Sequence, residues 1–271
     1  ASKLRSLDLD SQTSLYPKLK SKPDFDDLSS KAVLVFDPDS AVVLYQKNSD
    51  TKLLPASTQK LMTAVVVLEN CPMDKVVSVV GQFEKEGSQM GLVEGERITV
   101  RSLMYGLLIN SGNDAASVLA QNCASDEQDF VDLMNKKAAE IGMKNTHFAN
   151  STGLDDEGLY STALDLGRLA SYAMQQQAIA QIVSVSQASV ADATLSIWHP
   201  LHNVNRLLVQ IQGLLGIKTG ETAGAKENLI SLTRRGNHSL IVIVLGSNDR
   251  FGETTRLIDW FFTNTTWEKI N

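Results

Sequence analysis

The segment that decides how the chain is interpreted is residues 55–69, "PASTQKLMTAVVVLE". After Lys60 its residues are almost continuously apolar, which predicts a largely buried helix. This helix begins with a serine and a lysine one turn apart, although lysine is seldom fully buried without a partner. Ser57 and Lys60 are therefore either an ordinary helix start with a solvated lysine, or a nucleophile with its base.

The composition argues against several classes of protein. The 271 residues are 43% hydrophobic and 21% charged, which is typical of one large globular domain or of two subdomains with a shared core. The formal net charge is -6, and no basic block is present. We therefore expect neither a nucleic-acid partner nor binding to an anionic membrane surface. The longest apolar runs, such as residues 240–246, are too short to span a bilayer.

The order of the predicted elements suggests the fold class. Residues 1–30 are polar and lack apolar periodicity, and residues 32–48 contain two strand-like runs around Asp-Pro-Asp-Ser, which predicts a hairpin. The segments with helical spacing or helix caps are 101–110, 113–123, 126–143 and 161–174. The other strand-like segments and the final helix are 95–100, 213–220, 227–235, 239–247 and 254–262.

Strands at both ends with helices between them indicate an α+β fold. We expect one antiparallel sheet, built from N- and C-terminal strands and flanked by helices, beside an all-helical lobe. Residues 1–30 are predicted to be an N-terminal arm, and residues 31–271 one domain. Within it, residues 31–55 and 208–271 form the predicted sheet lobe, and residues from about 56 to 207 the helical lobe.

Three short motifs follow one another along the chain: S-x-x-K (Ser57, Lys60), S-x-N (Ser111, Asn113) and K-T-G (Lys218, Thr219, Gly220). Taken singly, each is better explained as a helix start, a capped turn, or a strand end with a solvated lysine. The chemistry also fits catalysis, because N–H groups at a helix start can hold an oxyanion and a lysine three residues on can reach the serine. The three motifs in this order, on a predicted helix, loop and strand, are the set of class A β-lactamases and penicillin-binding proteins.

With these motifs the chain resembles the low-molecular-weight penicillin-binding proteins, the serine D-alanyl-D-alanine carboxypeptidase family. Segments such as "GLVEGERITVRSLMYGLLINSGNDAA", "IGMKNTHFANSTGL" and "GIKTGET" extend the resemblance from about residue 30 to the end. It implies a β-lactamase/transpeptidase-like fold, a peptidoglycan stem peptide ending in D-Ala-D-Ala as substrate, covalent binding of β-lactam antibiotics, and no metal or organic cofactor.

The resemblance also implies a role for each motif residue. Ser57 attacks the carbonyl carbon between two D-alanines, and the neutral amine of Lys60 accepts the proton of the serine. Lys218 lies close by and helps to keep Lys60 neutral. Ser111 relays a proton to the departing amine, and Asn113 holds the substrate's amide.

Further residues are implied at the oxyanion and at the substrate. The backbone N–H groups of Ser57 and Glu221 are expected to form the oxyanion hole. Thr219, Gly220 and Arg250 are expected to bind substrate, with Thr219 and Arg250 on its terminal carboxylate, since a planar guanidinium suits a carboxylate. From the residues alone, Arg250 is also compatible with an exposed loop.

Two positions depart from the family pattern. Glu221 stands where an aromatic residue, histidine or threonine is common, and its charge would disfavour an anionic substrate unless the side chain points away. Lys226 stands where glycine is frequent. These departures concern substrate preference and rate more than the class of reaction.

Two further groups of residues could carry chemistry, but neither predicts a second functional site. His199 and His202 form an H-x-x-H without a partner motif, which does not support a metal site. A glutamate from a corresponding loop activates the deacylating water in class A β-lactamases. Here the segment matches the carboxypeptidase version, so we interpret Asp155, Asp156 and Glu157 as a solvated turn.

The two cysteines, Cys71 and Cys123, end helices that both begin at the predicted site. Their far ends are thus able to meet, and both a disulfide and two separate buried thiols remain open. The family works outside the cytoplasmic membrane, in the periplasm or at the cell wall, and we expect the same location here. Peripheral membrane attachment would require a segment not present in this sequence.

Three other functions compete with the carboxypeptidase. The first is a D,D-endopeptidase, which would cut D-alanyl cross-links with the same residues. The second is a weak β-lactamase, against which the missing loop glutamate counts. The third is a non-catalytic module that binds penicillin or muropeptides. The intact motifs count against this module, and only Glu221 favours it.

Overall fold

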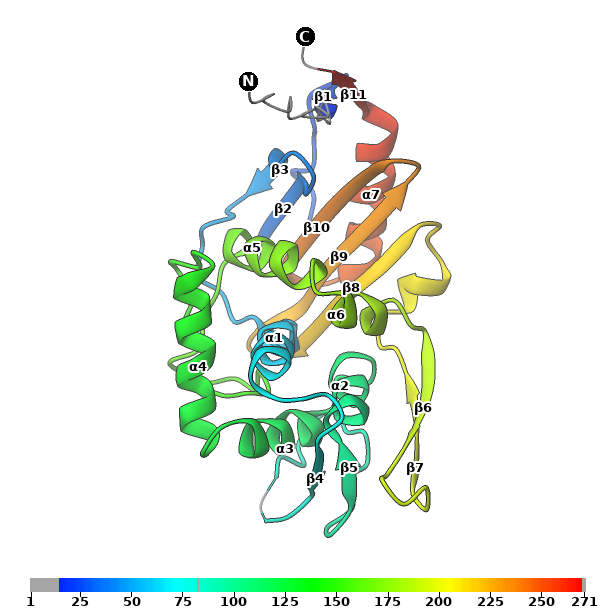
Figure 1. Cartoon of the computed structure of the whole chain (residues 1–271). Coiled ribbons are helices and arrows are strands. Elements are labelled where there is room, and N and C mark those ends of the chain that lie inside the picture. Colours follow the sequence, from blue (N-terminus) through cyan, green and yellow to red (C-terminus); the bar gives the residue numbers. More distant parts are fainter. Residues whose placement is uncertain (1–14, 82, 270–271) are drawn as a thin grey trace, which may run out of the picture.

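The computed structural model describes residues 15–81 and 83–269, which form a mixed helix and sheet structure (Figure 1). The strands of its large sheet are β2 (Ala32–Asp37), β3 (Val42–Lys47), β8 (Leu214–Thr222), β9 (Lys226–Arg235) and β10 (His238–Ser247). The helices are α1 (Lys60–Asn70), α2 (Val100–Leu108), α3 (Asn113–Cys123), α4 (Glu127–Glu140), α5 (Ala163–Met174), α6 (Gln177–Val183) and α7 (Arg250–Asn264).

The large sheet combines both ends of the chain. Its strand order is β3-β2-β10-β9-β8, and all neighbours are antiparallel. β2 and β10 are almost entirely buried, which explains why their sequences are continuous apolar runs instead of alternating ones. The predicted α+β fold is confirmed, together with the two hairpins of the sheet, β2–β3 and β9–β10.

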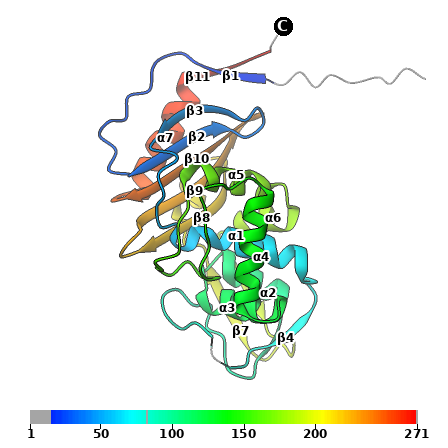
Figure 2. The same cartoon turned by 90° about the vertical axis from the view of Figure 1, so that its left-hand side faces the viewer.

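Alternate side chains of the sheet enter two separate hydrophobic cores. On one face, Val242 and Val244 pack with Leu257 and Phe261 of α7. On the other face, Ile243 joins the core of the helical lobe. Figures 1 and 2 show α7 on one side of the sheet and α5 on the other. The sheet is therefore a rigid layer between helices, and its edge strand β8 is held firmly in place.

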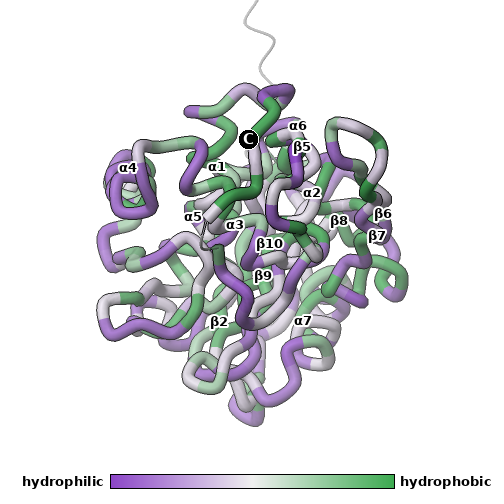
Figure 3. Tube along the Cα trace, turned by 90° about the horizontal axis from the view of Figure 1, so that it is seen from below, coloured by the Kyte–Doolittle hydropathy of each residue, from purple (hydrophilic) through white to green (hydrophobic). Residues whose placement is uncertain are grey.

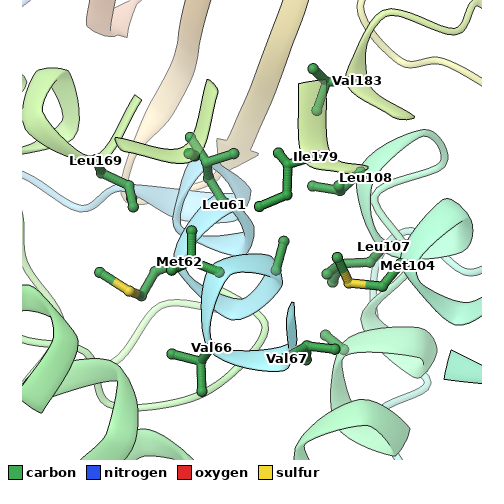
Figure 4. Packing of buried hydrophobic residues seen from close by; sticks show 14 of the residues in the cluster. Leu61, Met62, Val66, Val67, Met104, Leu107, Leu108, Leu169, Ile179 and Val183 are labelled. Atoms are coloured by element: carbon green, nitrogen blue, oxygen red, sulfur yellow. The ribbon is translucent and has the colours of Figure 1, made fainter. Parts of the chain in front are cut away.

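Helix α1 lies in the centre of the helical lobe, as the apolar sequence after Lys60 predicts. Its residues from Lys60 to Val67 are all buried, because a helix that is apolar on every side has to be surrounded by other elements. Figure 4 shows Leu61 and Val67 of α1 among side chains of α2, α5 and α6. The first turn before α1 is a 3-10 helix, η1 (Ala56–Gln59).

Cys71 and Cys123 form a disulfide bond, so the alternative of two separate thiols is not realised. Cys71 follows α1 directly and Cys123 is the last residue of α3. The bond therefore ties together the far ends of two helices whose first turns belong to different sequence motifs. It fixes the relative position of these helices independently of side-chain packing.

The described part of the predicted N-terminal arm, residues 15–30, contains a strand and a buried aromatic side chain that the sequence patterns did not indicate. β1 (Leu15–Leu19) pairs with β11 (Thr265–Lys269). Phe25 is 1% exposed, with its ring against those of Tyr45, Trp260 and Phe261. A single aromatic anchor leaves no apolar periodicity in the sequence, so the sequence patterns did not indicate this contact. Residues 1–14 lie outside the described part of the chain, and the division into lobes stays a prediction.

The sequence patterns missed several short elements. α6 was not predicted, nor was the hairpin of β6 (Gln187–Ala191) and β7 (Trp198–His202). The loop of this hairpin is held by Asp192, whose carboxylate accepts hydrogen bonds from the backbone N–H groups of Thr194, Ser196 and Ile197. The backbone bond from Ile197 contributes most to lowering the pKa of Asp192 to about 2. Such a side-chain clamp produces no periodic pattern.

A third strand pair, β4 (Val76–Ser78) with β5 (Arg97–Thr99), lies below the helices in Figure 1. Figure 3 shows α4 at the edge of the molecule, largely in the hydrophilic colour. Among the described residues, no helix has both the length and the apolar character needed to cross a membrane.

Candidate active site

The three motifs meet where the helical lobe touches the edge of the sheet. Lys60 Nζ lies 2.8 Å from Ser57 Oγ and 2.5 Å from Asn113 Oδ1. Lys218 Nζ, on β8, lies 2.8 Å from Ser111 Oγ. The S-x-N motif thus contacts the S-x-x-K motif through Asn113 and the K-T-G motif through Ser111, as expected if the three motifs form a single site.

The turn that carries Ser57 is fixed from several sides. Both the N–H and the hydroxyl of Thr58 donate to Pro55 O, which closes the 3-10 turn. The buried Asn228 of β9 donates from Nδ2 to Leu54 O and to Pro55 O. The nucleophile candidate itself is half-buried, so its hydroxyl is held by a rigid backbone while still being reachable from solvent. The sequence signal for Asn228 was a polar residue inside an apolar strand.

Lys60 has no exposed surface, and its amine has three neighbours. Besides Ser57 Oγ and Asn113 Oδ1, these include Thr152 O at 2.6 Å. A carbonyl oxygen and an amide oxygen can only accept hydrogen bonds, whereas a hydroxyl can also donate. A neutral amine therefore gives its two hydrogens to Asn113 and Thr152, and its lone pair faces the hydroxyl of Ser57.

The electrostatic surroundings favour this neutral form. Burial is the main cause that brings the pKa of Lys60 well below its ordinary value, and the positive charge of Lys218 lowers it further. The carboxylate of Asp114 acts in the opposite direction. Of the two interpretations of residues 57–60, the structure favours a nucleophile with its base over a solvated lysine.

Ser111 and Lys218 form the second pair. Ser111 adopts a left-handed backbone conformation, with φ of 58°, at the turn between α2 and α3. Lys218 is 2% exposed and donates to Ser111 Oγ and to Thr219 O. Burial, and next the charge of Arg250, lower the pKa of Lys218 to about 7. The pair can therefore deliver or take up a proton near neutral pH.

We expect Lys218→Met to raise the melting temperature by several degrees at pH 6, and by less as the pH increases toward 10. The unfolded lysine keeps its proton up to about pH 10.5, whereas the folded one loses it near pH 7. The wild type therefore gains stability as the pH rises through this window, and the methionine variant does not. Thermal unfolding of both proteins across this pH range measures the difference.

Lys144→Met, at an exposed lysine, is the control for the loss of one surface charge. A melting-temperature difference for Lys218→Met that stays constant with pH would contradict the assignment of a lowered pKa to Lys218.

The S-x-N turn is positioned by the loop of residues 86–91, which carries none of the three motifs. Asn113 donates from Nδ2 to Glu86 O, and its backbone N–H donates to Ser88 O. The next residue, Asp114, is fully buried and accepts from the backbone N–H groups of Met90 and Gly91. These bonds hold Asn113 Oδ1 in contact with Lys60. The only sequence signal was the acidic residue directly after the motif.

Two glycines allow the close approach of neighbouring chains to the serine turn. A Cβ atom at Gly220 would lie 3.0 Å from Ser57 N, and one at Gly153 would lie 2.3 Å from Ala56 O. β8 therefore passes directly beside the backbone N–H of Ser57. Glu221, whose backbone N–H is the second expected oxyanion donor, follows Gly220 directly on this strand.

Arg250 and Glu221 form an ion pair at the end of β8. Arg250 is 7% exposed, so the interpretation as an exposed loop arginine was wrong; the first turn of α7 directs it inward. Its Nη1 donates to Gly220 O at 3.1 Å and to Glu221 Oε2 at 2.8 Å. The side chain of Glu221 thus turns toward the arginine and not away from it. Thr219, also buried, precedes this pair on β8.

His199 and His202, the two histidines of the H-x-x-H motif, have different surroundings. His199 is buried and its Nε2 lies 2.7 Å from Glu96 Oε1, while His202 is exposed. Within the described ranges, no cluster of three or more His, Cys, Asp or Glu side chains could hold a metal ion.

The acidic turn at residues 155–157 is exposed, but it is not only a solvated turn. Asp155 accepts hydrogen bonds from Thr222 Oγ1 and Gly224 N. Its carboxylate connects the turn to the loop between β8 and β9, because the two loops lie side by side in the fold. This long-range contact could not be recognised from the acidic sequence.

Comparison with known proteins agrees with this geometry. The family model for D-alanyl-D-alanine carboxypeptidase (peptidase S11) matches residues 18–249. The chain is 35% identical to the D-alanyl-D-alanine carboxypeptidase DacF of Bacillus subtilis over 244 residues, which is 86% of this chain and 62% of that protein. A D-alanyl-D-alanine endopeptidase of Pseudomonas aeruginosa is 34% identical over 247 residues, 88% of this chain and 78% of the relative.

Among solved structures, the crystal structure of the Streptomyces K15 DD-transpeptidase superimposes with a TM-score of 0.83. The two are 30% identical, and the match covers 90% of this chain and 99% of the other. Because the family model spans most of the chain and the fold agrees with it, this chain belongs to the D-alanyl-D-alanine carboxypeptidase family, peptidase S11.

Proposed function

We propose that this chain is a serine D,D-carboxypeptidase that removes the terminal D-alanine from peptidoglycan stem peptides through an acyl-enzyme on Ser57. The observation that carries the proposal is the arrangement around Lys60. Its buried amine has two neighbours that can only accept hydrogen bonds and one, the hydroxyl of Ser57, that can donate. The names of the relatives support the same reaction class.

In the first half of the reaction, Lys60 takes the proton of Ser57 while Oγ attacks the carbonyl carbon between the two D-alanines. The carbonyl oxygen becomes an oxyanion, which the N–H groups of Ser57 and Glu221 stabilise. The C–N bond then breaks, and Ser111, in contact with Lys218, passes its hydroxyl proton to the departing amine of D-alanine. Ser111 is reprotonated with the proton that Lys60 took from Ser57, so Lys60 is neutral again before the second half of the reaction.

In the second half, a water molecule attacks the ester carbonyl of the acyl-enzyme. Lys60 takes a proton from this water, and the proton returns to Ser57 Oγ as the ester bond breaks. The products are the shortened peptide and the free enzyme. Asn113 holds the substrate's amide throughout, while Thr219, Gly220 and Arg250 are assigned to the carboxylate end.

The same chemistry acts on β-lactam antibiotics, whose strained amide acylates Ser57. Among the described residues, no carboxylate is hydrogen-bonded to Ser57 or Lys60, and Asp155 is engaged by Thr222 and Gly224. In a β-lactam the departing amine stays tethered to the acyl group and blocks the approach of water to the ester, and no carboxylate in the described part of the chain supplies a second base beside Lys60. The acyl-enzyme formed from a β-lactam is therefore expected to persist, which disfavours the β-lactamase alternative.

We assign the protein to a compartment outside the cytoplasmic membrane, where peptidoglycan is accessible. The disulfide between Cys71 and Cys123 supports this location, since such bonds persist in oxidising surroundings.

The test is the intact mass of the protein over time after addition of benzylpenicillin. We expect a lasting increase by the mass of one drug molecule in the wild type, and none in Ser57→Ala, because the hydroxyl is the acylated group. The same samples should release D-alanine from an acylated L-Lys-D-Ala-D-Ala peptide only when Ser57 is present. Unchanged D-alanine release in Ser57→Ala would refute the mechanism, and consumption of the drug without an adduct would favour a β-lactamase.

A further inference from the structure

The carboxylate of Glu221 forms an ion pair with the guanidinium of Arg250. The proposed function assigns the substrate's carboxylate to this same guanidinium. Nη1 of Arg250 is shared between Glu221 Oε2, at 2.8 Å, and Gly220 O, at 3.1 Å. Nε of Arg250 is buried and lacks a hydrogen-bond partner among the described residues. The arginine is therefore held in place by an anionic side chain of the enzyme itself, while part of its hydrogen-bonding capacity is unused.

A second carboxylate lies next to the pair. Glu227, on β9, is directly opposite Glu221 in the antiparallel register. Its Oε2 accepts the backbone N–H of Arg250. Arg250 thus contacts two glutamates, Glu221 through its guanidinium and Glu227 through its backbone N–H. An incoming carboxylate would have to displace Glu221 from the guanidinium or share the guanidinium with it.

The exposure of Glu221 indicates that this ion pair can be exchanged. The side chain of Glu221 is 58% exposed and that of Arg250 only 9%. The arginine is fixed, since its guanidinium also lies 4.9 Å from the ring of Phe251. The glutamate, in contrast, can leave the arginine by rotating into solvent at a modest free-energy cost.

We propose that Glu221 is a specificity-determining residue, which lowers the preference of the site for a free carboxylate after the scissile bond. Substrates whose leaving group is neutral at this position, because it is amidated or continues into another residue, do not have to displace Glu221 from Arg250. The inference rests on the proposed function, which places the substrate's leaving group beside Arg250. The pairing of Glu221 with Arg250 makes this site more tolerant of internal D-alanyl bonds than a site with an unpaired arginine would be.

A purely structural role for the pair gives different expectations. If Glu221 only fastened the end of β8 to α7, its replacement would change the cleavage of neutral and anionic substrates by the same factor. If it competes with the substrate, its replacement changes their ratio. The ratio is also insensitive to any disturbance of the oxyanion hole, because both substrates use that hole equally.

The experiment compares two peptides, an N-acylated L-Lys-D-Ala-D-Ala with a free carboxylate and the same peptide with a C-terminal amide. The kcat/KM for each is measured by mass spectrometry of the released D-alanine or D-alanine amide. We expect Glu221→Gln to raise the ratio of acid to amide by about tenfold, the size of one charge-assisted hydrogen bond. The change should lie mainly in KM for the acid.

Glu227→Gln is the matched control. It removes an equal charge from the facing strand position, and its amide oxygen can still accept the N–H of Arg250. Because Glu227 has no contact with the guanidinium among the hydrogen bonds of the described residues, the ratio should change much less. Glu221→Ala, at an exposed side chain, provides a second variant should glutamine itself bind Arg250.

The outcomes separate the two proposals. An unchanged ratio in both Glu221 variants, with both peptides cleaved, would overturn the inference while leaving the proposed function intact. An equal shift in Glu227→Gln would also overturn it, since a general field and not the contact would then be responsible. If the wild type cleaves neither peptide and forms no adduct at Ser57, the proposed function fails and the inference fails with it.

Discussion

Lys60→Met is expected to slow the acylation of Ser57 by about 100- to 10,000-fold, the usual contribution of a general base. Methionine has a similar volume and removes only the amine, so Ser57, Asn113 and Thr152 keep their places. The rate of adduct formation with benzylpenicillin, followed by intact mass, measures the loss. In the wild type this rate should rise with pH as Lys60 loses its proton, and this dependence should be absent in the variant.

The stability of this variant provides an independent check. Because the amine is buried and its pKa lies well below the ordinary value, removing it should leave the melting temperature unchanged or raise it. Lys52→Met, at an exposed lysine, controls for the loss of a charge elsewhere on the surface. A fully folded Lys60→Met that acylates at the wild-type rate would exclude Lys60 as the base.

Gly153→Ala is expected to destabilise the protein by about 2–5 kcal/mol and to impair acylation. Gly153 has φ of 88°, a conformation that costs a residue with Cβ about 1–2 kcal/mol. In addition, the new Cβ would lie 2.3 Å from Ala56 O, and overpacking of this kind typically costs about 1–3 kcal/mol. Relief of this clash has to move the turn that carries Ser57. Thermal unfolding and the rate of benzylpenicillin adduct formation measure the two effects.

Gly236→Ala is the matched control, since Gly236 also has a positive φ, of 61°, but nothing lies within 4 Å of the added Cβ. We expect Gly236→Ala to lose only the stability that the positive φ costs a residue with Cβ, and to acylate at the wild-type rate. If both variants lose the same stability and neither loses acylation, the contact between residues 153 and 56 does not position the nucleophile.

Much of the fold could be predicted because it is encoded locally. The continuous apolar runs of β2 and β10 identify buried strands, and the apolar residues after Lys60 identify a buried helix. The hairpin of β6 and β7, the pairing of β1 with β11 and the burial of Phe25 were missed. The loop of the first is held by the single side chain of Asp192, and the second joins segments at opposite ends of the chain. A single side chain that clamps a loop or enters a distant core leaves no periodicity.

The residues of the candidate site also differ in whether the sequence could identify them. The motif residues were recognised from their spacing, because a serine and a lysine three positions apart on one helical turn are always neighbours. Thr152 and Asn228 were missed, although both hold the serine and lysine in place. Thr152 acts through its backbone carbonyl, which any residue type would supply, so no residue pattern could identify it.

By itself, the sequence determined the α+β fold, the order of the three motifs and the pairing of Ser57 with Lys60. These features depend on neighbours along the chain and on the burial that apolar runs enforce. Only the tertiary structure decided that the amine of Lys60 contacts Asn113 and Thr152 as well as Ser57, that Cys71 bonds to Cys123, and that Glu221 turns toward Arg250. The physical reason is that protonation, disulfide formation and ion pairing depend on distances of a few ångströms between atoms that lie far apart in sequence.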